Sequence, residues 1–393
     1  MNAVLSRPPA LDPLVDAAFL ADPYPAYRAL REGGPIHWSE EFFGGAWLLT
    51  RHADVEAVLR DARFSAQRTG GWVNDAAAER GELAGFQKLF ARALLFLDAP
   101  DHGRLRALLQ PAFRPEALAR LKPVIGRIVD ELIDGLEDAD EFDLIAGLAR
   151  PLPVRVISQI LGIEGADRAE VMAWSDDLAA FIGAPQPSQE QARRAQASLL
   201  GGLLQARERG AIRDEAELLA QCAMLLFAGH ETTRNLLGNG LRALLSHPDQ
   251  WQRLRQAPEL IPSAVRELLR YDSPVQYTGR RVTTDLALHG QRLRRGVLVL
   301  TLIGAANRDP ARHDRPEQLD VTRADPGALS FSSGVHVCLG AALTRLEAEV
   351  VFGRLLARWP DLRLASVRPQ WCANPAYRGL AALLLRRAAA TFA

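Results

Sequence analysis

Apolar side chains recur every three or four positions along several long stretches, which is the spacing of one face of an α-helix. The clearest amphipathic stretch is 114–136, whose apolar face is formed by Leu118, Leu121, Ile125, Ile128, Val129 and Leu132. The same periodicity predicts helices over residues 54–59, 154–161, 216–245, 248–255, 262–271 and 341–358. Of these, 216–245 is the longest and most apolar, so we expect it to be a central helix.

Strand signals are fewer and shorter. Residues 35–50 hold two apolar runs around Gly44 and Gly45, which predicts a hairpin. Residues 275–301 and 360–387 carry turn signals and alternation that predict further short strands, and the apolar run 297–306 is expected to be a buried strand. Without repeats or a composition shift, residues 1–393 are expected to form a single domain that is mainly α with small β-sheets.

Composition narrows the function classes. The 47 basic and 47 acidic side chains balance, so no net positive field favours nucleic acid. The three cysteines are too few and too scattered for a disulfide framework, which fits a reducing cytoplasm. The N-terminus has no apolar core typical of a signal peptide, and no apolar run is long enough to span a membrane. We therefore expect a cytoplasmic protein that binds neither nucleic acid nor a membrane.

One cysteine lies in an unusual loop. Cys338 belongs to F-S-S-G-V-H-V-C-L-G, residues 331–340, where Gly334 and Gly340 allow a tight turn into the helix 341–358. Amides at a helix N-terminus stabilise a thiolate, and a thiolate ligand on haem iron favours O–O bond cleavage. A lone cysteine is more often a buried structural residue, and that interpretation is kept for Cys222 and Cys372.

Polar residues interrupt the apolar central helix at A-G-H-E-T-T, residues 228–233. Such a break in the local pattern is typical of a functional site. The Thr232 hydroxyl can bond to a helix carbonyl and leave a groove for dioxygen, and Glu231 can relay protons. The alternative is a solvated carboxylate beside a packing glycine.

Other polar residues are spaced to share one partner. Glu267 and Arg270 lie on one helical face, where a surface ion pair is the commoner interpretation. His102 and Arg106 lie one turn apart and can reach one anionic group, and Arg280 and Arg281 on a strand can supply further cations.

Together, in this order and at these separations, the motifs resemble those of the cytochrome P-450 superfamily, soluble bacterial class, over nearly the whole chain. The most specific match is the cysteine loop, which departs from the family pattern only where Ser332 replaces the first glycine. The resemblance implies a single-domain triangular fold with haem b between the long central helix and the loop of Cys338.

The resemblance also implies roles for individual residues. Cys338 is implied as the axial thiolate ligand, and Glu231 and Thr232 as the catalytic acid–alcohol pair. The remaining haem-binding residues are His102, Arg106, Ala228, Arg280, His336 and Gly340, with Arg281 as the substitute for Arg280. Glu267 and Arg270 would form a structural triad with Arg323. Residues implied to line the substrate pocket are Trp72, Phe86, Phe90, Leu225, Ala228, Val275, Gln276 and Tyr377.

The implied activity is insertion of one oxygen atom from dioxygen into a small apolar molecule, by hydroxylation or epoxidation, in secondary metabolism. Electrons would come from NAD(P)H through a separate ferredoxin and ferredoxin reductase, because no reductase domain is fused. A ferredoxin would dock beside Arg104, Arg114 and Arg345. A monomer is expected. The alternatives are oxidative coupling, peroxide-driven oxidation, or a ligand-binding haem protein without turnover.

Overall fold

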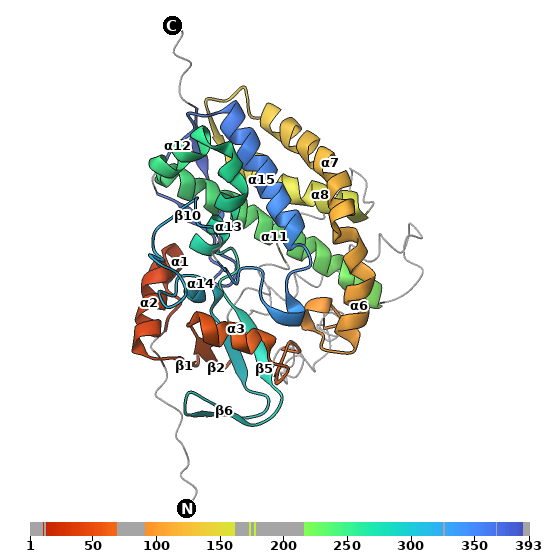
Figure 1. The fold of residues 1–393 in the computed structure, drawn as a ribbon, viewed down its shortest axis with the longest axis vertical. Coiled ribbons are helices and arrows are strands. Elements are labelled where there is room, and N and C mark those ends of the chain that lie inside the picture. Colours follow the sequence, from red (N-terminus) through yellow and green to blue (C-terminus); the bar gives the residue numbers. More distant parts are fainter. Residues whose placement is uncertain are drawn as a thin grey trace, which may run out of the picture.

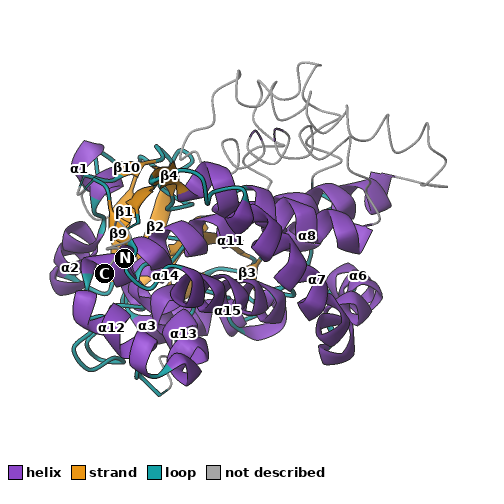
Figure 2. Cartoon of the chain, turned by 90° about the horizontal axis from the view of Figure 1, so that it is seen from above, coloured by secondary structure: helices purple, strands orange, loops and turns teal. Residues whose placement is uncertain are grey.

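The structure, a computed structural model, describes residues 11, 13–68, 91–161, 173, 177, 216–324, 327–366 and 368–387. Helices form most of the described chain and enclose small sheets, as the periodicity predicted (Figures 1 and 2). The α-helices are α1 (Ala17–Ala21), α2 (Tyr24–Gly33), α3 (His52–Arg60), α6 (Asp101–Leu109), α7 (Pro115–Asp134), α8 (Pro151–Leu161), α11 (Ala216–Ser246), α12 (Pro248–Gln256), α13 (Ile261–Tyr271), α14 (Ile303–Ala306) and α15 (Ala341–Arg358). Shorter helical turns are η1 (Leu94–Phe96), η2 (Gln110–Phe113), η3 (Ile145–Ala149), η5 (Pro258–Leu260) and η6 (Gly334–His336).

The central helix α11 is the axis of the helical part. It packs against α8, α13 and α15, and in Figure 1 it runs behind α15. Two glycines allow α11 to approach η3 and α15 closely. A Cβ at Gly238 would lie 2.6 Å from the Ile145 side chain, and one at Gly240 would lie 3.0 Å from the Phe352 ring. Side chains from these helices and α7 form one large apolar core, which fixes α11 relative to α15.

The main sheet has the strand order β1-β2-β8-β5-β3. Its strands are β1 (Ile36–Ser39), β2 (Ala46–Leu49), β3 (Phe64–Ser65), β5 (Thr278–Val282) and β8 (Leu298–Thr301), and the β1–β2 pair is the predicted hairpin. Smaller sheets pair β4 (Glu141–Asp143), β9 (Arg363–Leu364) and β12 (Leu384–Arg386), β6 (Leu286–Leu288) with β7 (Gln291–Leu293), and β10 (Gln370–Trp371) with β11 (Leu380–Ala382).

One predicted strand is wrong in its second half. The apolar run 297–306 forms β8 only to Thr301, and Ile303–Ala306 turns into α14. At this bend Gly304 lies against Tyr27 and Gln276, and the Gln276 side chain leaves no room for a Cβ at position 304. Within the described residues, no helix combines the length and apolarity needed to cross a membrane.

Candidate functional site

A cavity lies between α11 and the loop that leads into α15. Its empty volume is about 1530 Å³, part of which is continuous with solvent. Thr232 and Ala228 of α11 line one wall, and the segment 330–340 lines another. The cavity therefore separates the two sequence motifs that were singled out for chemistry, with space for a ligand between them.

Of the three cysteines, only Cys338 lines this cavity. Its backbone amide donates to the Phe331 carbonyl at 2.8 Å, which closes the loop. Burial raises the pKa of the Cys338 thiol, and the amides of Gly340 and Ala341 and the nearby Arg106 act in the opposite direction. Donors and a cation thus surround the sulfur where a thiolate needs them.

The other cysteines have different surroundings. The Cys372 sulfur accepts a hydrogen bond from Arg234 at 3.2 Å and lies in a separate, small pocket beside Trp371 and Arg378. Cys222 is partly buried on α11, and burial raises its pKa. Neither faces the cavity, in agreement with the structural interpretation given to both.

The loop holds Ser332 in a strained conformation. Its φ of +64° is in the left-handed region that favours glycine. The Ser332 hydroxyl oxygen is buried and has no hydrogen-bond partner among the residues that the structure describes. Gly334 also has a positive φ, +72°, and a Cβ there would lie 2.9 Å from the Leu59 carbonyl oxygen. The replacement of the family's glycine by Ser332 is therefore accommodated, with strain.

Basic side chains converge on the same cavity from three elements. His102 and Arg106 come from α6, Arg280 from β5 and His336 from η6, and the two imidazole rings are 4.1 Å apart. Burial lowers the pKa of Arg280 to about 9 and that of His336 to about 3. No ion pair joins any of these four to a carboxylate of the described chain.

This arrangement fits a haem. Arg106 and Arg280, with hydrogen bonds from His102 and His336, could hold the two propionates, and the Cys338 sulfur could ligate the iron. The strand register decides which arginine takes part, because Arg280 is buried whereas Arg281 donates to the Gly296 carbonyl at 2.6 Å. Arg281 is not needed as a substitute. Ala228 and Gly340 also line the cavity.

The acid–alcohol pair is divided between two surroundings. The Thr232 hydroxyl donates to the Ala228 carbonyl at 3.0 Å, as the sequence suggested, while α11 stays continuous. Glu231 does not line the cavity. Its carboxylate accepts from Arg234 and Asn235, both at 3.1 Å, and its side chain is only 5% exposed.

The predicted triad is assembled away from the cavity. Arg270 makes two hydrogen bonds to Glu267, at 2.7 and 2.8 Å, and Arg323 makes a third at 3.0 Å. Glu267 and Arg270 are fully buried, and Arg270 also donates to the carbonyls of Asn307, Pro316 and Gln318. The surface ion pair considered for Glu267 and Arg270 is therefore excluded.

Asn307 ties this region to the loop of Cys338. Its side-chain oxygen accepts a hydrogen bond from the Leu329 amide at 2.7 Å, and its side-chain nitrogen donates to the hydroxyls of Ser273 and Ser330. No role for Asn307 could be predicted from the sequence, because its partners are distant along the chain.

Some of the residues predicted for the substrate pocket line the cavity, whereas others do not or cannot be placed. Leu225, Ala228, Val275 and Tyr377 line the cavity, whereas Trp72, Phe86 and Phe90 lie outside the described residues. Gln276 does not line it, and that prediction is wrong. Neighbouring residues of an extended segment point in opposite directions, so Gln276 faces inward and donates to the Ser273 carbonyl at 2.7 Å.

Several lining residues were missed by the sequence argument. They are Arg68, Leu94, Leu95, Met224, Phe227, Tyr277, Thr344 and Glu347. Thr344 and Glu347 lie on α15, after Cys338 in the sequence and three residues apart, so they share one face of the helix. This spacing was the available sign in the sequence that both could face the cavity. Arg68 and the apolar members had no local signal.

Comparison with known proteins agrees with this geometry. The family model for cytochrome P-450 matches residues 184–361. Cytochrome P-450 107B1 of Saccharopolyspora erythraea is 38% identical over 94% of this chain and 96% of its own length. Cytochrome P-450 monooxygenase PikC of Streptomyces venezuelae is 38% identical over 97% of this chain and 95% of its own. A crystal structure of BioI, a cytochrome P-450 in complex with an acyl carrier protein that carries hexadec-9Z-enoic acid, superposes with a TM-score of 0.86 at 34% identity. That match covers 94% of this chain and 99% of the other.

Proposed function

The chain belongs to the cytochrome P-450 family and is a haem monooxygenase, and from this premise we propose that Cys338 holds the haem iron and that the substrate is a small apolar molecule. The observation that carries the proposal is one cavity lined by Cys338, by four basic side chains and by Thr232. When bound, the haem supplies dioxygen activation and oxygen-atom transfer. The residues described below supply binding, orientation and protons.

The basic side chains bind and orient the cofactor. His102 and Arg106, one helical turn apart, face one edge of the cavity together with His336, and Arg280 reaches it from β5. His102 and Arg280 are buried, which makes their interactions with carboxylates stronger than they would be in water. The amides of Gly340 and Ala341 lie next to the Cys338 sulfur and stabilise its thiolate form.

Proton delivery is proposed for the α11 pair. The Thr232 hydroxyl lies on the cavity wall and can turn from the Ala228 carbonyl to donate into the cavity. Glu231 can supply Thr232 only after its carboxylate leaves Arg234 or Asn235. We therefore propose that exchange of the Glu231 partners limits proton transfer from the protein surface.

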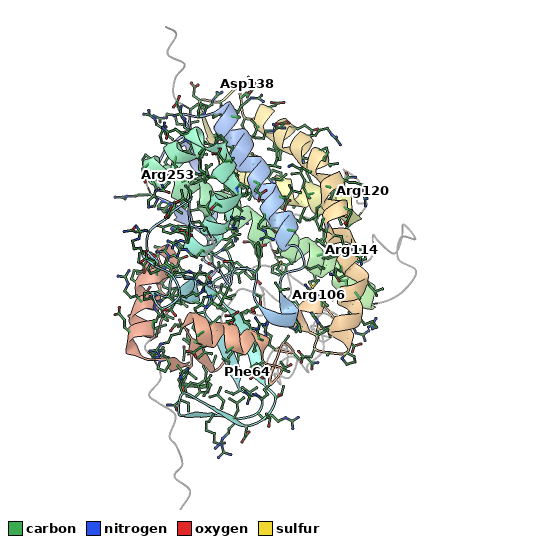
Figure 3. The ribbon with its side chains drawn as sticks, in the orientation of Figure 1. Phe64, Arg106, Arg114, Arg120, Asp138 and Arg253 are labelled. Atoms are coloured by element: carbon green, nitrogen blue, oxygen red, sulfur yellow. The ribbon has the colours of Figure 1, made fainter. Side chains whose placement is uncertain are left out.

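A separate ferredoxin, with its reductase, is the proposed electron donor. Leu108, Val335 and Val337 are exposed apolar side chains on α6 and around η6. In Figure 3, Arg106 lies beside the loop that leads into α15, and Arg114 and Arg120 follow along α7. A surface that combines exposed apolar side chains with nearby arginines is complementary to an acidic protein partner. Electron transfer from ferredoxin should slow as salt increases.

The first experiment is the carbon monoxide difference spectrum of the reduced protein. A thiolate-bound haem gives a strongly red-shifted Soret band, which Cys338→Ser should abolish. Cys372→Ser is the matched control and should keep the band. Loss of the band in both variants, or in neither, would contradict the assignment of Cys338.

Oxidative coupling and peroxide-driven oxidation remain alternative reaction types. The Thr232 hydroxyl in the cavity supports dioxygen as the oxidant. Turnover with NADH and redox partners should therefore exceed turnover with peroxide alone. Faster turnover with peroxide alone would favour peroxide-driven oxidation as the reaction type.

A further inference from the structure

One cation in the cavity exceeds what the haem requires. Arg68 follows β3 and lines the cavity. Its guanidinium donates to the Gly279 carbonyl at 3.3 Å and lies 4.9 Å from the centroid of the Phe96 ring. Neither contact neutralises its charge, and no ion pair joins it to an acidic side chain of the described chain. Burial lowers its pKa to about 10, so Arg68 stays protonated at neutral pH.

A phenol faces the same part of the cavity. Tyr377 also lines the wall, and its ring is held edge-on against Phe227 of α11, 5.5 Å between centroids. Its hydroxyl makes no hydrogen bond within the described residues. Burial raises the Tyr377 pKa to about 12, so the phenol is a neutral donor, and Arg68 acts on it as the nearby positive charge.

Much of the remaining lining of the cavity is apolar. Leu94, Leu95, Met224 and Leu225 line the cavity, and none of them can partner a charge. A buried cation without an anionic partner is costly. Arg106 and Arg280 carry the two positive charges that two propionates need, and His102 and His336 can add hydrogen bonds. Arg68 lies beside Arg280, since both donate to the Gly279 carbonyl, and its charge is a third one that remains for another anion.

We infer that Arg68 and Tyr377 together bind the carboxylate of the substrate, which is an organic acid with an apolar body. This inference rests on the proposed haem site and narrows its substrate class. A guanidinium and a phenol offer the donors that a carboxylate accepts. The acid is thereby held by one end in the cavity that Thr232 also lines.

The test compares matched acids and alcohols. Dodecanoic acid and 4-phenylbutanoic acid would be titrated beside 1-dodecanol and 4-phenyl-1-butanol, and binding followed by the spin-state shift of the Soret band. At least one acid should bind more tightly than its alcohol, by about tenfold to a hundredfold, which is typical of charge-assisted hydrogen bonds. Arg68→Met should remove this preference, and Tyr377→Phe should reduce it.

Arg63→Met is the matched control, because Arg63 is exposed and pairs with Asp61 near the same strand. It should keep the preference for acids. The inference would be overturned by a preference that survives Arg68→Met, by equal binding of acids and alcohols, or by no binding of either acid up to its solubility. If Arg68→Met retained less haem and the fraction that kept its haem still preferred acids, Arg68 would be a propionate ligand and the inference would be overturned.

The carbon monoxide spectrum separates this inference from the proposed function. If the wild-type protein shows the red-shifted band but does not prefer acids, only the inference about Arg68 fails. If the band itself is missing, the haem–thiolate proposal fails first.

Discussion

Replacing Ser332 by glycine should stabilise the protein. A left-handed conformation costs a residue with a Cβ roughly 1–2 kcal/mol, and Ser332 has a φ of +64°. Its hydroxyl is buried without a partner among the described residues, which costs about 1–3 kcal/mol more. Glycine relieves both but loses about 0.5–1 kcal/mol through the greater freedom of the unfolded chain. The net gain in the free energy of unfolding for Ser332→Gly should therefore be about 1–4.5 kcal/mol.

Urea unfolding at fixed haem and protein concentrations measures this gain as a higher midpoint at an unchanged slope. Ser333→Gly is the control, because Ser333 has a φ of −144° and no such strain. That variant should be slightly less stable than the wild type. Ser332→Ala separates the two contributions, since it removes the hydroxyl and keeps the Cβ. A Ser332→Gly protein no more stable than the wild type would refute the reasoning.

Three further predictions concern buried ionisable side chains, and each can be tested by urea unfolding. Burial raises the Glu347 pKa from 4.5 to about 8, so the folded protein keeps a proton that the unfolded chain releases between these values. Stability should fall as pH rises through this window, and Glu347→Gln should flatten the fall; an unchanged slope would contradict it. Arg270→Met should cost roughly 3–5 kcal/mol, because it leaves a buried carboxylate, and Arg323→Met should cost less because Arg270 remains; equal losses would contradict this. The single variant Arg234→Met should be less stable than the double variant Arg234→Met/Glu231→Gln, because only the single variant keeps the Glu231 charge after its Arg234 ion pair is lost. If the loss of stability in the double variant equals the sum of the losses in the two single variants, the ion pair does not contribute.

Elements were predictable where the pattern is local and long. Periodicity located α7, α11 and α15 within a few residues, because each buries one face against a core that its own spacing defines. The apolar run 297–306 was predicted less well, because its second half turns into α14, where Gly304 packs against Tyr27 and Gln276. Those contacts are tertiary and leave no trace in local sequence.

The candidate site shows the same division. Cys338, His336 and Gly340 share one motif, so sequence spacing placed them together. By contrast, the sequence put Glu231 beside Thr232 as one catalytic pair, whereas the fold turns its carboxylate towards Arg234 and Asn235. On a helix, adjacent residues point about 100° apart, so neighbours in a motif need not face one cavity.

Arg68 marks the limit of motif reasoning most clearly. In the sequence it is one of many arginines in a chain with no net charge, and nothing beside it suggests a ligand. It acquires meaning only when β3 pairs with β5 and brings it beside Gly279, in a cavity that Arg280 and Tyr377 also line. Residues that bind the cofactor are recognisable from a shared motif, because the cofactor is the same throughout the family. A residue that binds this protein's own substrate is identified here as a positive charge that the cofactor does not need. Identifying it requires knowing which charged side chains line the cavity, and only the folded chain shows that.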